Sequence, residues 1–367
     1  MSYQNESVGF LVVGAGFLGA QRAAAVHAAR GTRLFAVHDA DPRTASAVAS
    51  RFGARAVDDL AEALDCPGVD AVVIATPHAD HFPQALAALE AGKMVLCEKP
   101  LTVRPEDARF LALRADELRL RLGTGLNHRF YPPVADALEL CSSWQIGRVE
   151  GVRAEIGHKA SPKFLSSWHT ELSRSGGGTL MDNGPHACDL IRRLLGEVVA
   201  AMGYRRESLG LPSGCEVECY ALFRDFDQGF AELRSSWNQP TGYLTLEVRG
   251  SEGFLVIETA PWRLSGVLAS GRQLLRTYVM ERARERAFRV RHGCERSLVQ
   301  EIEAFVAPQE ARPRREASGW DGCRVTEMID AVYRSDATGT EVRLEPPLSH
   351  LPSSSRRRAA GRTVRAA

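Results

Sequence analysis

A glycine-rich turn between an apolar run and an alanine-rich stretch constrains the fold of this chain more than any other feature. Residues 8–13 are apolar, and the turn that follows, GAGFLG, carries glycines at positions 14, 16 and 19. The stretch 20–30 has the composition of a helix, and a second apolar run ends at Asp39. The order strand, turn, helix, strand predicts a βαβ unit, which joins two parallel strands.

The alternation of apolar runs and helical segments continues over the first third of the chain. We expect further strands within 69–77 and 94–100, and helices at 42–53, 58–65, 78–92 and 105–122. Strands that alternate with helices predict a doubly wound parallel sheet. We therefore predict an α/β fold in which a Rossmann domain spans residues 1–126.

The pattern changes after about residue 126. Long segments that alternate in polarity, joined by short turns with glycine, indicate an antiparallel sheet with one solvent-facing side. The segments expected to be strands are 147–157, 215–225, 228–237, 242–259 and 277–284. Helices are expected at 178–195, at 296–307 and from Trp320 onward. The second domain, 127–348, is therefore predicted to be α+β, with helices on one side of a large, mostly antiparallel open sheet.

Composition and charge exclude several classes of protein. The formal net charge of +1 gives no overall field for nucleic acid, and no run of 18 apolar residues could span a membrane. The polar start predicts no secretion signal. Eight cysteines form no CxxC pair, so we expect reduced thiols, no metal site and a cytoplasmic protein. Residues 349–367 are rich in serine, alanine and arginine, which predicts a disordered basic tail.

The glycine turn has the GxGxxG spacing of a dinucleotide-binding fingerprint. Gly14 would permit the tight turn, Gly16 the approach of a pyrophosphate, and Gly19 the close packing of helix on strand. Phe17 and Leu18 would lie at the amino end of the helix, which would face the phosphates. A purely structural βαβ turn is the alternative.

The acidic residue at the end of the second strand bears on the choice of cofactor. Asp39 lies 20 residues after Gly19, where it would accept hydrogen bonds from ribose hydroxyls and repel a 2′-phosphate. This favours NAD over NADP. Arg43 is close enough in sequence to offset the charge, so NADP stays the less favoured alternative.

Polar residues also follow the later strands of the parallel sheet. Thr76 and Pro77 lie at a carboxyl strand end, where doubly wound sheets bind ligands. His78 and His81 could form a metal pair, but no third ligand is nearby. We expect His81 at the start of a helix, either beneath the cofactor or in a structural role.

A Glu-Lys-Pro turn ends the next strand. Glu98 and Lys99 would therefore share the ligand edge, and Pro100 favours an extended backbone at Lys99. The ammonium group of Lys99 could donate to a substrate hydroxyl or stabilise a developing alkoxide. The alternative is a surface lysine paired with Glu98.

These motifs, taken in order, resemble those of the Gfo/Idh/MocA oxidoreductases. The matching blocks include GAGFLG, ATPHADHFPQALAALEAGKMVLCEKPL, NHRFYP, IGRVEGVRAEIG and SGGGTLMDNGPHACDLIRRLLGEV, and they cover roughly residues 8–346. The resemblance implies an NAD(P)-binding domain and an α/β domain whose outer sheet face often serves in oligomerisation, here as a dimer or tetramer. It also implies that Lys99 is the Glu-Lys-Pro lysine, and that Asp182 and His186 are the D-x-G-x-H pair.

The segment from Ser175 to Asp189 carries the acid–base candidates. A helix that begins after the glycines at 176–178 would place Asp182 and His186 on one face, and Pro185 should bend it. We expect His186 to be the general acid/base and Asp182 to orient the substrate hydroxyl. Asp189 could fix the imidazole tautomer or form a salt bridge with Arg192 or Arg193. A helix cap with an ordinary buried histidine is the alternative.

Other residues are expected to contact the substrate near the interdomain cleft, some on a loop at 157–171. The candidates are Lys99, Asn127, Arg129, His158, Lys159, Trp168, His169, Asp182 and His186.

Three functions fit these observations. The first is an NAD-dependent dehydrogenase or reductase that acts on a secondary hydroxyl of a sugar, cyclitol or glycoside. Only four lysines accompany 42 arginines, a bias typical of GC-rich bacteria, so ring oxidation in aminoglycoside or other antibiotic biosynthesis is a candidate setting. The second is an NAD-dependent glycosidase of the same fold, and the third a non-catalytic binding protein for NAD or a metabolite.

Overall fold

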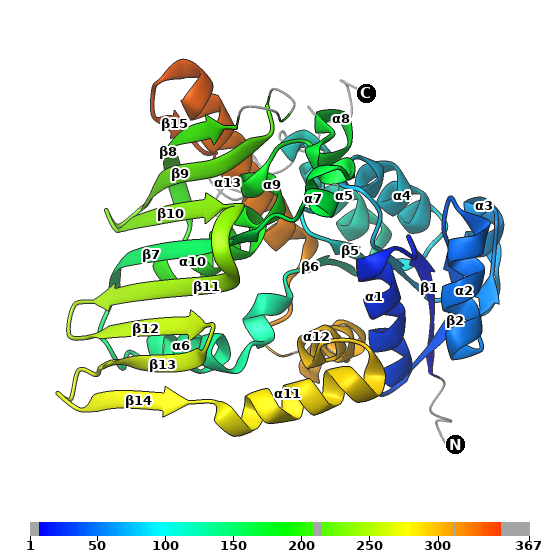
Figure 1. The fold of residues 1–367 in the computed structure, drawn as a ribbon, viewed down its shortest axis with the longest axis horizontal. Helices are drawn as coiled ribbons and strands as arrows, with labels where there is room; N and C mark the ends of the chain where they lie inside the picture. Colours follow the sequence, from blue (N-terminus) through cyan, green and yellow to red (C-terminus); the bar gives the residue numbers. More distant parts are fainter. Residues whose placement is uncertain (1–6, 209–210, 212–213, 312, 314, 346–367) are drawn as a thin grey trace.

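Two sheets lie side by side in the computed structural model, which describes residues 7–208, 211, 214–311, 313 and 315–345 (Figure 1). The smaller sheet comes from the first third of the chain and the larger one from the rest. The predicted tail, 349–367, lies outside the described residues. Among the helices in those ranges, none combines the length and apolar character needed to cross a bilayer.

The smaller sheet contains six parallel strands in the order β3-β2-β1-β4-β5-β6. The strands are β1 (Val8–Val13), β2 (Thr32–His38), β3 (Arg55–Ala56), β4 (Ala71–Ile74), β5 (Met94–Glu98) and β6 (Leu122–Gly125). This confirms the predicted parallel sheet. The strand order reverses between β1 and β4, and sheets of this kind bind ligands outside the carboxyl strand ends at such a point.

Helices cover both faces of the parallel sheet. They are α1 (Phe17–Ala28), α2 (Pro42–Phe52), α3 (Leu60–Asp65), α4 (His78–Glu90) and α5 (Pro105–Leu118). Phe10 and Val12 of β1 pack with α1 and α2, whereas Leu11 and Val13 pack with α3, α4 and α5. Because both faces of each strand are buried, the strands read as continuous apolar runs in the sequence.

The larger sheet contains nine strands in the order β14-β13-β12-β11-β7-β10-β9-β8-β15. The strands are β7 (Val149–Lys159), β8 (Val198–Glu207), β9 (Glu216–Asp225), β10 (Phe230–Ser236), β11 (Asn238–Gly250), β12 (Phe254–Thr259), β13 (Trp262–Val267), β14 (Gln273–Thr277) and β15 (Val342–Arg343). Among the strand pairs of this larger sheet in the described residues, only β7–β10 is parallel. The sheet is therefore mostly antiparallel, as predicted.

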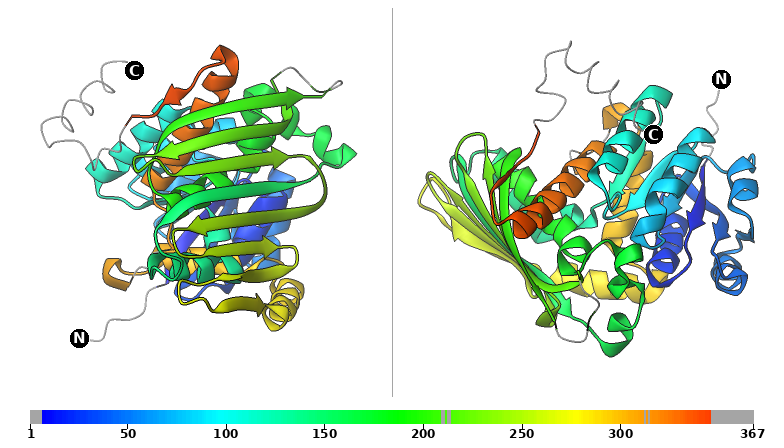
Figure 2. Two further views of the ribbon diagram at one scale, coloured as in Figure 1. Left: turned by 90° about the vertical axis from the view of Figure 1, so that its left-hand side faces the viewer. Right: turned by 90° about the horizontal axis from the view of Figure 1, so that it is seen from above.

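Helices cover one face of the larger sheet and leave the other open (Figure 2). The helical elements after β6 are η1 (Asn127–Phe130), α6 (Pro132–Ser142), α7 (Pro162–Leu165), η2 (Trp168–Thr170), α8 (Leu172–Ser175), α9 (Thr179–Asp182), α10 (Gly184–Leu195), α11 (Val279–His292), α12 (Arg296–Val306), η3 (Gln309–Ala311) and α13 (Gly319–Thr338). Helices α6, α10 and α13 pack on the sheet, while α12 packs beside α1 and α13 also contacts α5. The last two helices therefore join the two halves of the molecule. The domain boundary at residue 126 stays a prediction.

The predicted elements differ from the structure at several points: strands β6, β8 and β13 were not predicted, and α5 ends at Leu118 rather than at residue 122. The strand expected at 277–284 is wrong beyond Thr277, because α11 begins at Val279. Glu285 and Arg289 form an i, i+4 ion pair on this helix, which favours the helical conformation. The helix expected at 178–195 is interrupted at Asn183, between α9 and α10, consistent with the bend predicted from Pro185.

Candidate active site

The carboxyl end of β5 meets the α9–α10 segment of the second domain. Lys99 follows β5, and its Nζ donates to the main-chain oxygen of Asp182 at 2.6 Å and to Asp182 Oδ1 at 3.2 Å. The other carboxylate oxygen, Oδ2, accepts from Trp237 Nε1 at 3.1 Å. The Asp182 carboxylate is thus held between the two sheets, and Lys99 pairs with it rather than with Glu98.

Lys99 keeps Asp182 ionised. Burial by itself would raise the pKa of this carboxyl, but the nearby positive charge of Lys99 overcomes that effect and lowers the pKa to about 2. Both side chains are more than four-fifths buried. The pair therefore presents a fixed cation and a fixed carboxylate at one point of the site.

His186 lies in the first turn of α10 and stacks on His128 of η1. The ring centroids are 3.8 Å apart and the planes differ by 9°. Burial lowers the pKa of His186 well below its ordinary value, and the proximity of His128 and Lys99 lowers it further. Burial also lowers the pKa of His128, to about 3. Both imidazoles are therefore neutral near pH 7, so His186 is in the form that accepts a proton.

Both stacked histidines have a ring nitrogen without a partner in the described structure. Nδ1 of His128 and Nδ1 of His186 are buried and form no hydrogen bond there. Buried polar atoms are paired in the great majority of cases, so unpaired ones point to a bound molecule or to a catalytic role. The two rings and Lys99 line the same cavity.

The cavity that contains these residues measures about 1490 Å³. It lies between the helix-covered face of the larger sheet, α11 and the parallel sheet. Its lining includes Lys99, His128, His158, Asn183, His186, Tyr243 and Trp262. Another cavity, of about 1600 Å³, is lined from α6, α10 and α12 and contains none of the predicted catalytic residues. The cavity of about 1490 Å³, which contains Lys99 and His186, is the candidate active site.

The loop expected to cross the cleft forms an aromatic stack beside Asp182. Trp168 and His169 stack at 3.9 Å, and Trp168 meets His78 edge-on at 4.9 Å. Burial lowers the pKa of His169 to about 4, although the Asp182 carboxylate acts in the opposite direction. His158 lines the cavity, and its Nδ1 lies 3.3 Å from Asn183 Oδ1.

The cavity lining does not include Asp182, Trp168 or His169, and three more predicted residues also lie outside it. Lys159 is exposed at the end of β7. Asn127 is buried and donates to Ser297 Oγ on α12 at 2.9 Å. His81 is fully buried, with ring nitrogens 2.8 Å from Pro100 O and 3.0 Å from Thr76 O. Of the two roles considered for His81, these contacts favour the structural one.

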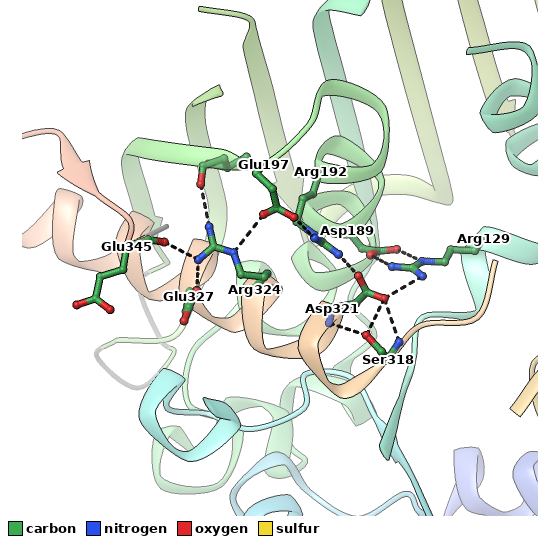
Figure 3. A network of polar contacts seen from close by, with 10 residues as sticks. Arg129, Asp189, Arg192, Glu197, Ser318, Asp321, Arg324, Glu327 and Glu345 are labelled. Atoms are coloured by element: carbon green, nitrogen blue, oxygen red, sulfur yellow. Dashed lines mark hydrogen bonds and ion pairs between the residues drawn. The ribbon is translucent and has the colours of Figure 1, made fainter. Parts of the chain in front are cut away.

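The prediction that Arg129 contacts the substrate is corrected by its surroundings. Arg129 is fully buried, and its Nε donates to Asp189 Oδ2 at 2.7 Å. Its Nη1 donates to the main-chain oxygen of Glu316, and the network continues through Asp321 on α13 to Arg192 on α10 (Figure 3). A buried guanidinium needs such partners. Asp189 therefore pairs with Arg129 and with neither His186 nor the arginines of its own helix.

Glu98 fixes the main chain at Lys99 through hydrogen bonds. Glu98 Oε1 accepts from Arg22 Nε at 2.5 Å, and Oε2 accepts from the Lys99 main-chain N–H at 3.2 Å. Arg22 Nη1 also donates to Glu301 Oε2 at 2.6 Å, and all these charged side chains are buried except that of Lys99. Glu98, predicted to bind the cofactor, thus directs its carboxylate to the protein. It connects the cofactor helix α1, Lys99 and α12.

The glycine turn fits a dinucleotide. Gly14 has φ +87°, and a Cβ on Gly19 would lie 1.8 Å from Gly14 O, so both positions require glycine. A Cβ on Gly16 would meet no atom within 4 Å, which leaves space above the turn. Gly16 also gives α1 no side-chain cap, so the first N–H groups of this helix are available to an anion.

The remaining predicted cofactor residues surround this turn. Phe17 is 87% exposed and Leu18 is partly exposed at the start of α1. Asp39 Oδ2 accepts from Ala15 N at 2.6 Å. The residue that was expected to bind the ribose hydroxyls therefore also stabilises the glycine turn. Thr76 and Pro77 are partly exposed just after β4. These residues would hold the adenosine and phosphate parts of NAD.

Comparison with known proteins agrees with this geometry. Residues 8–126 match the family model "Oxidoreductase family, NAD-binding Rossmann fold", and residues 134–256 match "GFO/IDH/MocA C-terminal domain". The chain belongs to the Gfo/Idh/MocA family, as its motifs predicted. It is an oxidoreductase with an NAD-binding Rossmann domain.

Individual relatives span nearly the whole chain. Inositol 2-dehydrogenase 2 of Saccharopolyspora erythraea is 30% identical over 349 residues, which cover 91% of this chain and 94% of that protein. The structure of GenD2 from gentamicin A biosynthesis in complex with NAD is 30% identical, with a TM-score of 0.77 over 94% of this chain and 98% of that one. Levoglucosan dehydrogenase in complex with NADH and levoglucosan is 25% identical, with a TM-score of 0.80 over 92% and 99% of the two chains.

Sequence reasoning missed two residues of the site, His128 and Trp237. His128 stands between two residues that were selected, Asn127 and Arg129, but the direction of each side chain in a short 3-10 turn is not visible in the sequence. Trp237 closes a predicted strand and reads as a core residue. Its indole N–H is a signal for a buried acceptor, because a buried tryptophan usually finds a partner for that group.

Proposed function

We propose that this protein is an NAD-dependent dehydrogenase that oxidises, or reversibly reduces, a secondary hydroxyl of a sugar, cyclitol or glycoside. The observation that carries the proposal is that Lys99, which is paired with Asp182, lines one cavity with a neutral His186. The relatives named as inositol and levoglucosan dehydrogenases support the substrate class.

Each residue has a separate task in this reaction. The proton of the substrate hydroxyl passes to His186, which is neutral and lines the cavity. The ammonium group of Lys99 stabilises the oxygen as negative charge develops on it. Asp182 holds Lys99 in place and orients the hydroxyl. NAD supplies the hydride acceptor, and the chain supplies position and electrostatics.

Asp39 favours NAD over NADP. Its carboxylate lies beside the glycine turn, where it would repel a 2′-phosphate, and Arg43 on the following helix is paired with Asp41 at 3.6 Å. We expect kcat/KM for NAD to exceed that for NADP by at least tenfold. Equal efficiency with the two cofactors would contradict this assignment.

The ring-hydroxyl oxidation could belong to aminoglycoside or other sugar-containing natural-product biosynthesis. The similarity to GenD2 from gentamicin A biosynthesis favours this setting. A ketone produced on a sugar ring is a suitable substrate for later transamination. This setting is a narrower part of the proposal and depends on the substrate itself.

Turnover with a substrate panel tests the proposal. NADH formation is followed at 340 nm with inositols, sugars, glycosides and aminoglycosides. We expect net NADH with at least one of them. Release of a free sugar without net NADH would indicate an NAD-dependent glycosidase of the same fold. Binding of NAD and ligand without either reaction would indicate a non-catalytic binding protein.

We also propose that the open face of the larger sheet forms a homodimer or tetramer contact. The strands β8, β9, β10 and β12 expose large apolar side chains there, namely Tyr204, Tyr220, Leu222, Phe230 and Phe254. Contiguous exposed apolar surface of this kind marks interaction sites. Light scattering should give a dimer or tetramer mass, and Leu222→Arg should reduce that mass toward the monomer.

A further inference from the structure

Helix α11 forms the side of the candidate active site that no sequence motif suggested. It leaves the edge strand β14 and runs below the space between the two sheets toward the carboxyl end of α1 (Figure 1). None of its residues is buried. The helix contributes several residues to the lining of the 1490 Å³ cavity that also contains Lys99 and His186, among them Arg282, Arg286 and Arg289.

Most charged side chains of the cavity are neutralised within the protein. Lys99 pairs with Asp182, and Arg263 pairs with Glu258. Arg289 Nη2 lies 2.7 Å from Glu295 Oε1, and Glu295 Oε2 accepts from Tyr131 at 3.1 Å. Glu285, on α11 between Arg282 and Arg286, lies 4.0 Å from Arg289 Nη2 and accepts from Arg296 N at 3.2 Å. These paired groups leave little net charge for a ligand.

Two cavity arginines differ from the rest. In the described part of the chain, the guanidinium groups of Arg282 and Arg286 form no hydrogen bond and no ion pair. They are four residues apart, so they lie on one face of α11 about one turn from each other. Like charges at this spacing repel, and the repulsion is relieved when an anion binds between them. The stacked imidazoles of His128 and His186 are neutral and add no charge of either sign.

The phosphates of the dinucleotide do not account for these arginines. Gly293, which follows α11, lies beside Arg51 in the last turn of α2. α2 starts at the carboxyl edge of the parallel sheet and runs back across it, so its last turn is at the opposite edge from Gly16. The carboxyl end of α11 is thus anchored away from the glycine turn, and the arginines face the cavity from that side.

We propose that Arg282 and Arg286 form a subsite for an anionic group of the substrate, a carboxylate or a phosphate, remote from the hydroxyl that is oxidised. Two guanidinium groups one helical turn apart suit the paired oxygens of such a group. This inference rests on the proposed function, which supplies the substrate class. It narrows that class to a sugar or cyclitol that carries an acidic group. It disfavours a substrate that already carries several amino groups, since its ammonium groups would meet unpaired cations.

The subsite is compatible with a place in natural-product assembly. Oxidation would then act on a phosphorylated or carboxylated sugar unit before amino groups are introduced. The reaction that supplies the substrate would be a phosphorylation or an oxidation of a primary alcohol to an acid.

Binding to the NADH-saturated enzyme tests the subsite without depending on turnover. The probes are D-glucose, D-glucuronate, D-glucose 6-phosphate and D-glucosamine, which share a ring but differ in charge, and Kd is measured by calorimetry. We expect at least one of the two anions to bind 10-fold or more tightly than glucose, and glucosamine to bind no better than glucose. The better anion distinguishes a carboxylate from a phosphate ligand.

Substitutions test whether Arg282 and Arg286 cause the tighter binding of the anion. The double variant Arg282→Gln/Arg286→Gln should lose about 10- to 100-fold in affinity for that anion while binding glucose and NADH as before. Arg291→Gln, on the same helix and outside the cavity lining, is the matched control and should change nothing. The proposal is overturned if neither anion binds more tightly than glucose, if the double variant keeps the preference, or if it changes only the oligomer mass. In a separate assay with NAD, absence of NADH formation with every probe would count against the proposed function and leave these binding results decisive for the subsite.

Discussion

Trp237 Nε1 donates a hydrogen bond to Asp182 Oδ2 at 3.1 Å, on the carboxylate whose other oxygen accepts from Lys99. Trp237 is 2% exposed and follows β10 of the larger sheet, whereas Lys99 follows β5 of the parallel sheet. A single carboxylate therefore connects the larger sheet to the ligand edge of the smaller one. The position of the candidate catalytic lysine depends on a residue 138 positions later in the chain.

Replacement of this tryptophan should weaken catalysis through Asp182. Trp237→Phe removes the N–H donor and keeps an aromatic ring, so we expect kcat/KM to fall about 10-fold, the effect of one hydrogen bond to a charged group. Steady-state kinetics measure the change. In an Asp182→Asn background, Trp237→Phe should have a much smaller further effect. Equal effects in both backgrounds would show that Trp237 acts by packing alone.

The stack of His128 on His186 makes a second prediction. His128→Ala would leave His186 without its neighbouring ring, and we expect kcat to fall about 10-fold because the base is no longer held in one orientation. His128→Phe keeps the stack and should retain most of the activity. If the phenylalanine variant is as impaired as the alanine variant, the ring nitrogens of His128 take part directly.

Two glycines of the fingerprint should respond differently to the same substitution. Gly16→Ala places its Cβ in open space, so the protein should fold normally while KM for NAD rises at least 10-fold, because the methyl group occupies the approach of the pyrophosphate. Gly19→Ala would place a Cβ 1.8 Å from Gly14 O and should lower the melting temperature. Thermal unfolding and NAD kinetics separate the two effects. Unchanged KM in the Gly16 variant would argue against the predicted cofactor position.

Buried neutral histidines should make the protein sensitive to acid. Burial lowers the pKa of His128 to about 3 and that of His169 to about 4, whereas unfolded histidine titrates near 6.5. Below pH 6.5 the unfolded chain binds protons that the folded chain does not, so stability is complete above this pH and is lost as the pH falls toward 4. Glu301 acts in the opposite sense, because burial raises its pKa to about 7.

The expected result is a melting temperature that falls by about 5 °C between pH 7 and pH 5. Differential scanning fluorimetry over this range provides the measurement. The combined variant His128→Phe/His169→Phe should show a smaller fall, since two of the responsible groups are absent. A melting temperature that rises on acidification would mean that Glu301 and other carboxyls dominate.

The fold was largely predictable because its strands and helices carry strong local patterns. The parallel sheet has apolar runs ended by glycine, proline or acidic residues, and its strands β1, β2, β4 and β5 were predicted. β6 was not, because the expected helix ran to residue 122. Helix α11 was not predicted, because its polar and apolar residues alternate as in a strand. It has no buried face that would impose a helical spacing of apolar residues. Its exposure is also why the sequence did not suggest that Arg282 and Arg286 face a cavity.

Site residues could be predicted only where a sequence motif both specified the residue type and placed the residue at a known position in the fold, such as the end of a strand. Lys99 and Asp182, which the resemblance singled out, are in contact, and His186 lines the same cavity as Lys99. Arg129 belongs to another matching block, NHRFYP, and its side chain turns inward, where Asp189 neutralises it. Which side of a short turn a residue faces depends on tertiary packing, and the sequence alone does not specify it.

The roles of Lys99 and His186 are the central claim, and kinetics of Lys99→Ala and His186→Ala test it most directly. Each variant is first shown to bind NADH with a Kd within about twofold of wild type, so that a loss of turnover cannot come from a lost cofactor. Oxidation of the best substrate is then followed at 340 nm. We expect kcat to fall at least 100-fold in each variant. Near wild-type turnover in both would contradict the account.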